Sequence, residues 1–212
     1  MDLKNILRLY VVLDLDVLGR RSPLDTTRSL LRGGVSALQL RAKGRSIRAQ
    51  AEIIGALLPF TREAGVPLII NDHLELALAL RADGVHLGVD DLPVALARRC
   101  FPEAIIGYSP AGIHDLPSAA AADYLGVGPI YATGTKLDAG PPIGLGGLRA
   151  MLEATHLPVV AIGGIGAAVA AEVVAAGASG VAVCGAVLNA ADPGQAAADL
   201  ALSLPTGALS WH

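Results

Sequence analysis

The sequence has few cysteines and few aromatic residues. Its 212 residues include two cysteines and one tryptophan, and aromatic residues make up 3% of the chain. Cys100 and Cys184 lack the close spacing of a metal site or a redox motif. This pattern argues against a disulfide-stabilised fold and predicts a reduced, cytoplasmic setting.

Positive charge is also scarce. Lys and Arg total 16 against 19 for Asp and Glu, which gives a formal net charge of −3. The chain therefore does not have the broad basic surface of a nucleic-acid-binding protein. Arg8, Asp14 and Asp16 interrupt the apolar N-terminal stretch, so we expect neither a signal peptide nor a membrane span there. No linker or low-complexity segment divides the chain, which predicts one domain over residues 1–212.

Eight short runs rich in Val, Ile and Leu recur along the chain, and such runs are typical of buried strands. They occupy residues 9–14, 37–42, 67–72, 84–88, 104–109, 124–129, 158–164 and 180–185. Segments with helical spacing lie between most of them. Residues 22–34 carry an N-cap serine followed by proline and stop at Gly33 or Gly34. Residues 46–65 and 164–177 also end at glycine.

This alternation predicts a single α/β domain with a (β/α)8 TIM-barrel fold. An open, doubly wound sheet would use the same alternation and is the alternative. The number of strands favours the barrel. So do the glycines after the last two strands, where barrels commonly bind phosphate.

In a TIM barrel the chemistry lies at the C-terminal ends of the strands. Polar residues gather there in this sequence. They are Gln39, Arg41 and Lys43; Asn71 and Asp72; Asp90 and Asp91; Ser109; Thr133, Thr135 and Lys136; and the glycine-flanked backbone near Gly164 and Cys184.

Most of these groups also have a purely structural explanation. Residues 39–43 could form a solvated strand edge, and the pairs at 71–72 and 90–91 could cap the helices that follow. His86 is expected to be a packed strand residue rather than a ligand. No Ser–His or Cys–His pair is evident, which indicates chemistry driven by electrostatics at a leaving group rather than by a protein nucleophile.

Taken together, the polar groups favour a binding site for anions. Carboxylates on adjacent strand ends suit Mg²⁺, which prefers one or two carboxylates together with water and phosphate oxygens. Arg41, Lys43 and Lys136 suit a highly charged anion, and the backbone amides after the last two strands suit a second phosphate. The residues thus predict a barrel that binds a magnesium diphosphate, with room for a monophosphate.

Several ordered motifs resemble those of the thiamine phosphate synthase family. They are "QLRAK", "INDHLELALALRADGVHLGVDDLP", "YLGVGPIYATGTK", "PPIGLGGL" and "VVAIGGI", spread over residues 37–165. "RLYVVLD" and "GVAVCGAV" extend the resemblance to most of the chain. The resemblance implies a transferase of thiamine biosynthesis that condenses a hydroxymethylpyrimidine diphosphate with a thiazole phosphate, giving thiamine phosphate and diphosphate by a dissociative, Mg²⁺-assisted route.

The resemblance also implies a role for each matching residue. Gln39, Arg41, Lys43, Asn71, Ser109 and Lys136 would hold the pyrimidine diphosphate, with Arg41, Lys43 and Lys136 as the catalytic cations. Asp72 and Asp91 would bind Mg²⁺; between Asp90 and Asp91, only the family pattern selects the second. Thr133, Thr135, Gly164, Val183 and Cys184 would hold the thiazole phosphate.

The sequence departs from the family pattern in two places. "YSPAG" follows the fifth strand where the family usually has a Thr–His or similar pair after the serine, so the surroundings of Ser109 are expected to differ. Cys184 stands where serine is common, a change of little consequence if only its backbone N–H is used.

Two other functions fit the same fold. A thiazole tautomerase would need a proton-transfer group, and the retained "QLRAK", aspartates and "TGTK" disfavour it. A non-catalytic thiamine phosphate-binding protein would bind without turnover. We expect small phosphorylated substrates as partners and neither nucleic acid nor membrane, while the sequence leaves homo-oligomer formation open.

Overall fold

The protein is described by a computed structural model that covers residues 3–134 and 140–205. The elements follow in this order: α1 (Leu3–Leu7), β1 (Leu9–Asp14), α2 (Leu15–Leu18), α3 (Pro23–Arg32), β2 (Ala37–Arg41), α4 (Ile47–Glu63), β3 (Leu68–Asn71), α5 (Leu74–Leu80), β4 (Gly84–Leu87), α6 (Val94–Cys100), β5 (Ile105–Tyr108), the 3₁₀ helix η1 (Ile113–Ala119), β6 (Tyr124–Val127), α7 (Gly144–Glu153), β7 (Val159–Ile162), α8 (Ala167–Ala175), β8 (Gly180–Val183), α9 (Gly185–Leu188) and α10 (Pro193–Ser203). Each predicted strand segment contains one of these strands.

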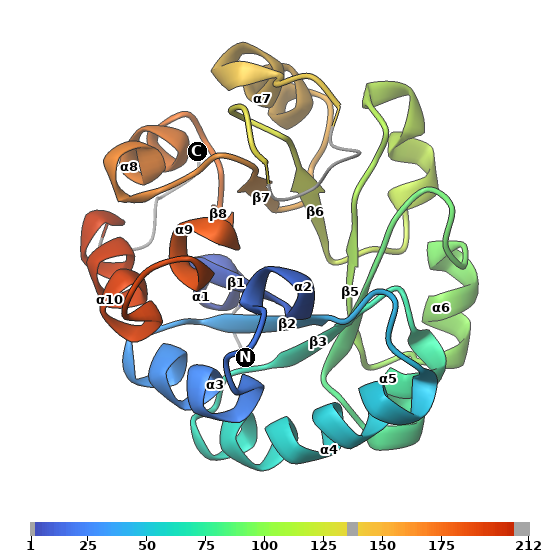
Figure 1. Ribbon diagram of the computed structural model, residues 1–212. Coiled ribbons are helices and arrows are strands. Elements are labelled where there is room, and N and C mark those ends of the chain that lie inside the picture. The colour runs from blue at the N-terminus through green and yellow to red at the C-terminus, as the bar shows by residue number, and fades with distance from the viewer. Residues whose placement is uncertain (1–2, 135–139, 206–212) are drawn as a thin grey trace.

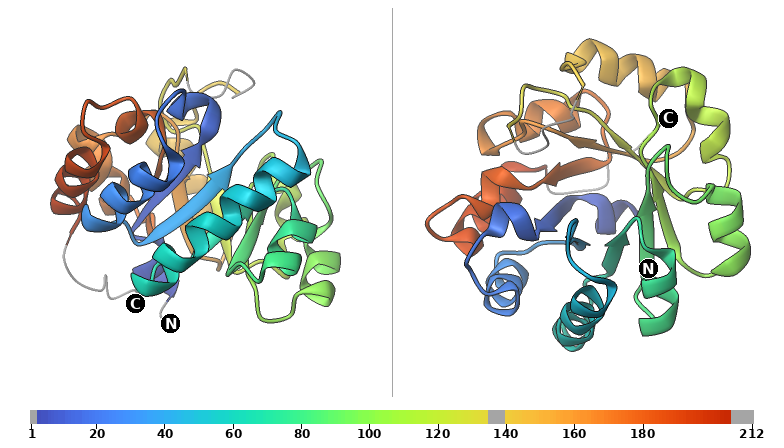
Figure 2. Two further views of the ribbon diagram at one scale, coloured as in Figure 1. Left: turned by 60° about the horizontal axis from the view of Figure 1, so that its bottom comes forward. Right: turned by 45° about the vertical axis from the view of Figure 1, so that its right-hand side comes forward.

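The eight strands form a closed barrel. Each strand pairs in parallel with the next, and β8 pairs with β1 to complete the cylinder. Figure 1 shows the strands at the centre with the helices arranged around them, and the side views in Figure 2 show helices lying along the outside of the strands. The predicted (β/α)8 TIM barrel is therefore confirmed, and the open-sheet alternative is wrong.

Local sequence signals set the starts of several helices. The Ser22 hydroxyl accepts a hydrogen bond from the backbone N–H of Asp25 and caps α3, as predicted. Ser46 caps α4 in the same way. Within residues 3–134 and 140–205, no helix has both the length and the apolar character needed to cross a membrane.

The alternation of side chains along each strand separates the core from the cavity. Leu9, Val11 and Leu13 of β1 belong to the large apolar cluster that the strands share with the surrounding helices. Tyr10 and Asp14, at alternate positions on β1, face a cavity inside the barrel. The same period-two pattern explains why polar residues recur at every second position near the end of β2.

Side chains also fasten the strands together at the end of the barrel where they begin. Ser36, Asp83 and Asp123 immediately precede β2, β4 and β6. Each accepts a hydrogen bond of 2.7–2.8 Å from a backbone N–H at the beginning of the preceding strand. We call these three contacts the basal latches; they lie at the opposite end of the strands from the cavity mouth.

Candidate active site

A cavity of about 770 Å³ opens at the C-terminal ends of the strands. Every predicted site residue that the structure describes lines it. These residues are Gln39, Arg41, Lys43, Asn71, Asp72, Asp91, Ser109, Thr133, Gly164, Val183 and Cys184. Thr135 and Lys136 lie outside the described residues. The structure thus gathers side chains from strands far apart in sequence around one space.

The two described cations each face a carboxylate. The Arg41 guanidinium forms a hydrogen-bonded ion pair with Asp14, which is 3% exposed. The other Asp14 oxygen accepts hydrogen bonds from the N–H groups of Asp16 and Val17, which begin α2. Asp14 therefore fixes Arg41 against the wall of the cavity.

Lys43 lies further out, and its side chain is 53% exposed. Its ammonium group is 3.6 Å from the Asp72 carboxylate. A pair this exposed contributes little to stability, so the ammonium group can turn towards an arriving anion at small cost.

Asp72 and Asp91 bring two carboxyl groups together at the mouth. Asp72 adopts a left-handed backbone conformation, with φ of 63°, which is uncommon for a residue other than glycine. Burial raises the pKa of the Asp72 carboxyl, and the charge of Asp91 raises it further, while Lys43 acts in the opposite direction. Asp91 is itself held by the Gly88 backbone N–H, which donates to its carboxylate over 2.6 Å.

This carboxylate pair fits a magnesium ion. Two crowded carboxylates destabilise each other's charge, and a divalent cation would relieve that repulsion. Among the described residues, no group of three or more His, Cys, Asp or Glu side chains forms a metal-binding cluster. Two carboxylates with further positions for water and phosphate oxygens are the ligands that Mg²⁺ prefers.

The structural explanations proposed for these aspartates are wrong. The N-cap of α5 is His73 and that of α6 is Pro93, and neither helix has a side-chain cap. The pairs at 71–72 and 90–91 therefore do not cap these helices. A solvated strand edge is also wrong for Gln39, which is 4% exposed and lies inside the barrel.

No Ser–His pair is evident in the sequence, but the structure brings one together. His86 on β4 and Ser109 after β5 lie side by side, with the imidazole Nε2 2.8 Å from the Ser109 Oγ. The imidazole Nδ1 faces the hydroxyl of Tyr124, 3.0 Å away, rather than a carboxylate. Burial lowers the pKa of His86 to about 4, so the ring is neutral near pH 7. His86 is thus not merely a packed strand residue.

Glycine-rich backbone forms the opposite wall. Gly163 and Gly164 follow β7 with φ of 96° and 67°, conformations that glycine adopts without steric cost. They lead into Gly166 and α8, whose N-terminus has no side-chain cap. Such an N-terminus leaves backbone N–H groups for an anion.

Cys184 follows β8 in the same wall. Burial raises the pKa of its thiol to about 12, so the sulfur stays protonated near pH 7.

Three residues that sequence reasoning missed also face the cavity: Asp14, Tyr10 and Tyr124. Asp14 is a polar residue at the C-terminal end of a strand, the signal that identified the other candidates. The tyrosines occupy inward positions of apolar runs, where the sequence alone does not distinguish a packing role from a polar one.

A (β/α)8 barrel with anchored cations, paired carboxylates and a glycine wall around one cavity defines an enzyme of the class that handles small phosphorylated molecules. A family model described as thiamine monophosphate synthase matches residues 9–187. The thiamine-phosphate synthase of Herpetosiphon aurantiacus is 59% identical over 168 residues, which cover 78% of this chain and 81% of that protein. The chain therefore belongs to the thiamine-phosphate synthase family.

Other relatives and solved structures agree. The thiamine-phosphate synthase of Chloroflexus aurantiacus is 49% identical over 168 residues, covering 78% of each chain. The structure of thiamine phosphate pyrophosphorylase from Pyrococcus furiosus matches with a TM-score of 0.87 and 38% identity, over 95% of this chain and 97% of that one. A 3-hexulose-6-phosphate synthase with 20% identity and a TM-score of 0.67, covering 93% of this chain and all of that one, shares the fold alone.

Proposed function

We propose that the cavity joins a pyrimidine methyl diphosphate to a thiazole phosphate, releasing diphosphate. The chain is a transferase with the activity of a thiamine-phosphate synthase, and it acts on small phosphorylated substrates. The observation that carries the assignment of the site is that cations, paired carboxylates and a glycine wall line a single cavity at the strand ends.

The diphosphate would lie against Arg41 and Lys43. Asp14 holds the Arg41 guanidinium in place, so its N–H donors need no rearrangement to meet a leaving group. Fixed donors of this kind stabilise charge as it develops in the transition state. Lys136 is assigned to the same role by its match to the family motif.

The pyrimidine would lie between Gln39, Asn71 and Ser109, with its methylene carbon towards the glycine wall. As the carbon–oxygen bond to diphosphate breaks, the electron-rich aminopyrimidine stabilises the positive charge left on that carbon. The thiazole nitrogen then forms the new carbon–nitrogen bond. No protein nucleophile is needed, in agreement with a histidine that contacts a tyrosine rather than a carboxylate.

The thiazole phosphate would bind the opposite wall, at Thr133, Thr135, Gly164, Val183 and Cys184. Because α8 has no side-chain cap at its N-terminus, the backbone there can donate to phosphate oxygens. The thiol of Cys184 is not required for this, since a backbone N–H serves equally well whether the residue is serine or cysteine.

Asp72 and Asp91 would hold Mg²⁺. When bound, the ion would supply Lewis-acid stabilisation of the diphosphate leaving group. Asp90 offers a matched comparison because it is adjacent and exposed, whereas Asp91 hydrogen-bonds with Asp72. We further propose that residues 1–212 form one domain and that the enzyme works in the cytoplasm.

The decisive experiment mixes the purified protein with both phosphorylated precursors, with Mg²⁺ or with a chelator. Mass spectrometry follows thiamine phosphate, and a coupled assay follows diphosphate. We expect both products in equal amounts and only with Mg²⁺. Thiazole isomerisation without diphosphate release would indicate a tautomerase, and binding without turnover would indicate a non-catalytic protein; either result overturns the proposal.

Two variants test the metal assignment in the same assay. Asp91→Asn is expected to lower turnover by about 10²–10³, the usual effect of removing one electrostatic stabiliser, and to raise the Mg²⁺ concentration needed for half-maximal rate. Asp90→Asn is expected to change neither quantity by more than about twofold, as for a surface substitution. The reverse ranking would assign the second ligand to Asp90.

A further inference from the structure

Five polar side chains that line the cavity form a continuous hydrogen-bonded chain. The Gln39 amide nitrogen donates to the Tyr10 hydroxyl over 2.9 Å, and that hydroxyl is 2.8 Å from the hydroxyl of Tyr124. Tyr124 continues to the His86 Nδ1 at 3.0 Å, and the His86 Nε2 reaches the Ser109 Oγ at 2.8 Å. All five residues line the cavity, and the two tyrosines among them are almost fully buried.

The inner end of this chain fixes its direction. Tyr10 and Tyr124 are 2% and 1% exposed, so a hydroxyl proton without an acceptor there would be costly. Because the Tyr10 oxygen accepts from Gln39, its own proton is best satisfied by donating to Tyr124. Tyr124 must then donate to the Nδ1 of His86.

The direction carries through to the cavity. An imidazole that accepts at Nδ1 carries its single proton on Nε2. That N–H donates to the Ser109 Oγ and occupies one lone pair of the oxygen. The hydroxyl proton of Ser109 is thereby left to point away from His86, into the cavity.

We propose that Tyr10, Tyr124 and His86 are positioning residues that commit the Ser109 hydroxyl to donate a hydrogen bond to the pyrimidine diphosphate. This inference rests on the proposed function, because it deepens the role of Ser109 in that site. The acceptor would be a diphosphate oxygen or an unprotonated ring nitrogen, both of which carry lone pairs. A serine whose hydroxyl rotates freely would have to be oriented when the substrate binds, and this ordering would reduce the affinity.

Two glycines leave space for this arrangement. A Cβ atom at Gly107 on β5 would overlap the Tyr124 ring and the His86 Nδ1. A Cβ atom at Gly126 on β6 would lie 2.9 Å from the Ser109 Oγ and 3.0 Å from the His86 Cε1. The inner faces of both strands are therefore empty where the tyrosine, histidine and serine meet.

The first test determines the direction of these hydrogen bonds without measuring enzyme activity. Nitrogen-15 NMR of the full-length protein, labelled at histidine, distinguishes a protonated from an unprotonated ring nitrogen. We expect His86 to carry its proton on Nε2 in the wild type and to lose this preference in Tyr124→Phe. A His86 protonated on Nδ1 in the wild type would overturn the proposal, even if the protein makes thiamine phosphate.

The second test asks whether Tyr124 acts through Ser109. Tyr124→Phe removes only the hydroxyl, and we expect kcat to fall about tenfold, equivalent to one hydrogen bond of ordinary strength. In a Ser109→Ala background the same change should have no further effect, because there is no hydroxyl left to orient. A purely structural role predicts the same factor in both backgrounds, and that result would overturn the proposal.

Tyr108→Phe is the matched control. Tyr108 is also a buried tyrosine, but its hydroxyl donates to Asp115 over 2.7 Å, outside this chain. We expect its kcat to stay within about twofold of the wild type, with the His86 tautomer unchanged. If the wild-type protein makes no thiamine phosphate, the proposed function itself is refuted. The NMR result would still decide the direction of the hydrogen bonds from Tyr10 to Ser109.

Discussion

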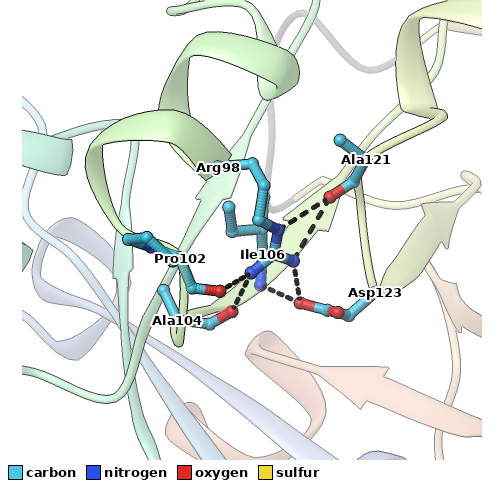
Figure 3. Close-up of polar contacts among 6 residues, drawn as sticks. All are labelled: Arg98, Pro102, Ala104, Ile106, Ala121 and Asp123. Carbon is cyan, nitrogen blue, oxygen red and sulfur yellow. Dashed lines mark hydrogen bonds and ion pairs between the residues drawn. The ribbon is translucent and has the colours of Figure 1, made fainter.

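Arg98 of α6 provides a prediction that separates stability from chemistry. Its guanidinium donates to the carbonyl oxygens of Pro102 at 2.9 Å, Ala104 at 2.7 Å and Ala121 at 3.2–3.3 Å. It also forms an ion pair with Asp123 at 2.6 Å, and Asp123 accepts the hydrogen bond of one basal latch. Figure 3 shows this fork joining the end of α6 to the starts of β5 and β6.

The structure sets the size of the expected effect. Arg98→Ala leaves three carbonyl groups without the guanidinium donor, while the Asp123 carboxylate loses its cation and keeps the Ile106 N–H. A hydrogen bond to a charged group is worth about 1.5–3 kcal/mol. The Arg98 and Asp123 side chains are 26% and 35% exposed, so water replaces much of what is lost. We therefore expect a loss of about 3 kcal/mol in the free energy of unfolding, which corresponds to a fall in Tm of about 6–12 °C for a chain of this size.

Differential scanning calorimetry and urea unfolding measure this change directly. Arg99→Ala is the matched control, because Arg99 is the next residue of the same helix and is exposed; its effect should stay within about 0.5 kcal/mol. Because the basal latches lie at the opposite end from the cavity, kcat of Arg98→Ala should match the wild type well below its Tm. A fall in Tm of less than about 2 °C, under 1 kcal/mol for a chain of this size, or a large loss of kcat, would refute the reasoning.

Three further predictions concern the cavity. Asp14→Ala should lower kcat by about tenfold or more, because Arg41 loses the carboxylate that holds it and α2 loses its cap; steady-state kinetics would contradict this by showing a change in KM alone. Cys184 should react with a thiol reagent at pH 8 on the order of 10² times more slowly than a thiol of ordinary pKa, because a pKa of about 12 leaves little thiolate and the greater nucleophilicity of that thiolate compensates only in part. The exposed Cys100 should be labelled first, and equal rates for the two thiols would be inconsistent with the partly buried position of Cys184. Gly164→Ala should lose at least about 1 kcal/mol of stability and weaken binding of the thiazole phosphate, since φ is 67° and a Cβ would lie 2.7 Å from the Ala132 carbonyl oxygen; calorimetric titration that shows wild-type affinity would contradict it.

The fold was accessible from sequence because its signals are local. Each strand is a short apolar run, and a serine such as Ser22 marks a helix start within a few residues. These patterns depend on burial and on backbone hydrogen bonds near in sequence. In a closed parallel barrel the C-terminal ends of all strands share one rim. Residues at those ends can therefore be placed together once the fold is predicted.

The polar pairs could not be obtained in this way. Arg41 meets Asp14, and His86 meets Ser109, across neighbouring strands, so each pair depends on the register between two segments. The local sequence shows a polar side chain at a strand end but not the partner that it meets. The local sequence also favours helix capping for Asp72. An aspartate before a helix looks the same in sequence whether its carboxylate caps the helix or turns towards another strand.

The left-handed backbone at Asp72 places two requirements on a single position. The side chain must supply a carboxylate, and the main chain must tolerate a conformation that, among non-glycine residues, asparagine and aspartate adopt most readily. Asparagine is consequently the substitution that keeps the turn while removing the charge, whereas alanine alters both. Replacing Asp72 by a larger side chain would therefore also require a different backbone turn between β3 and α5.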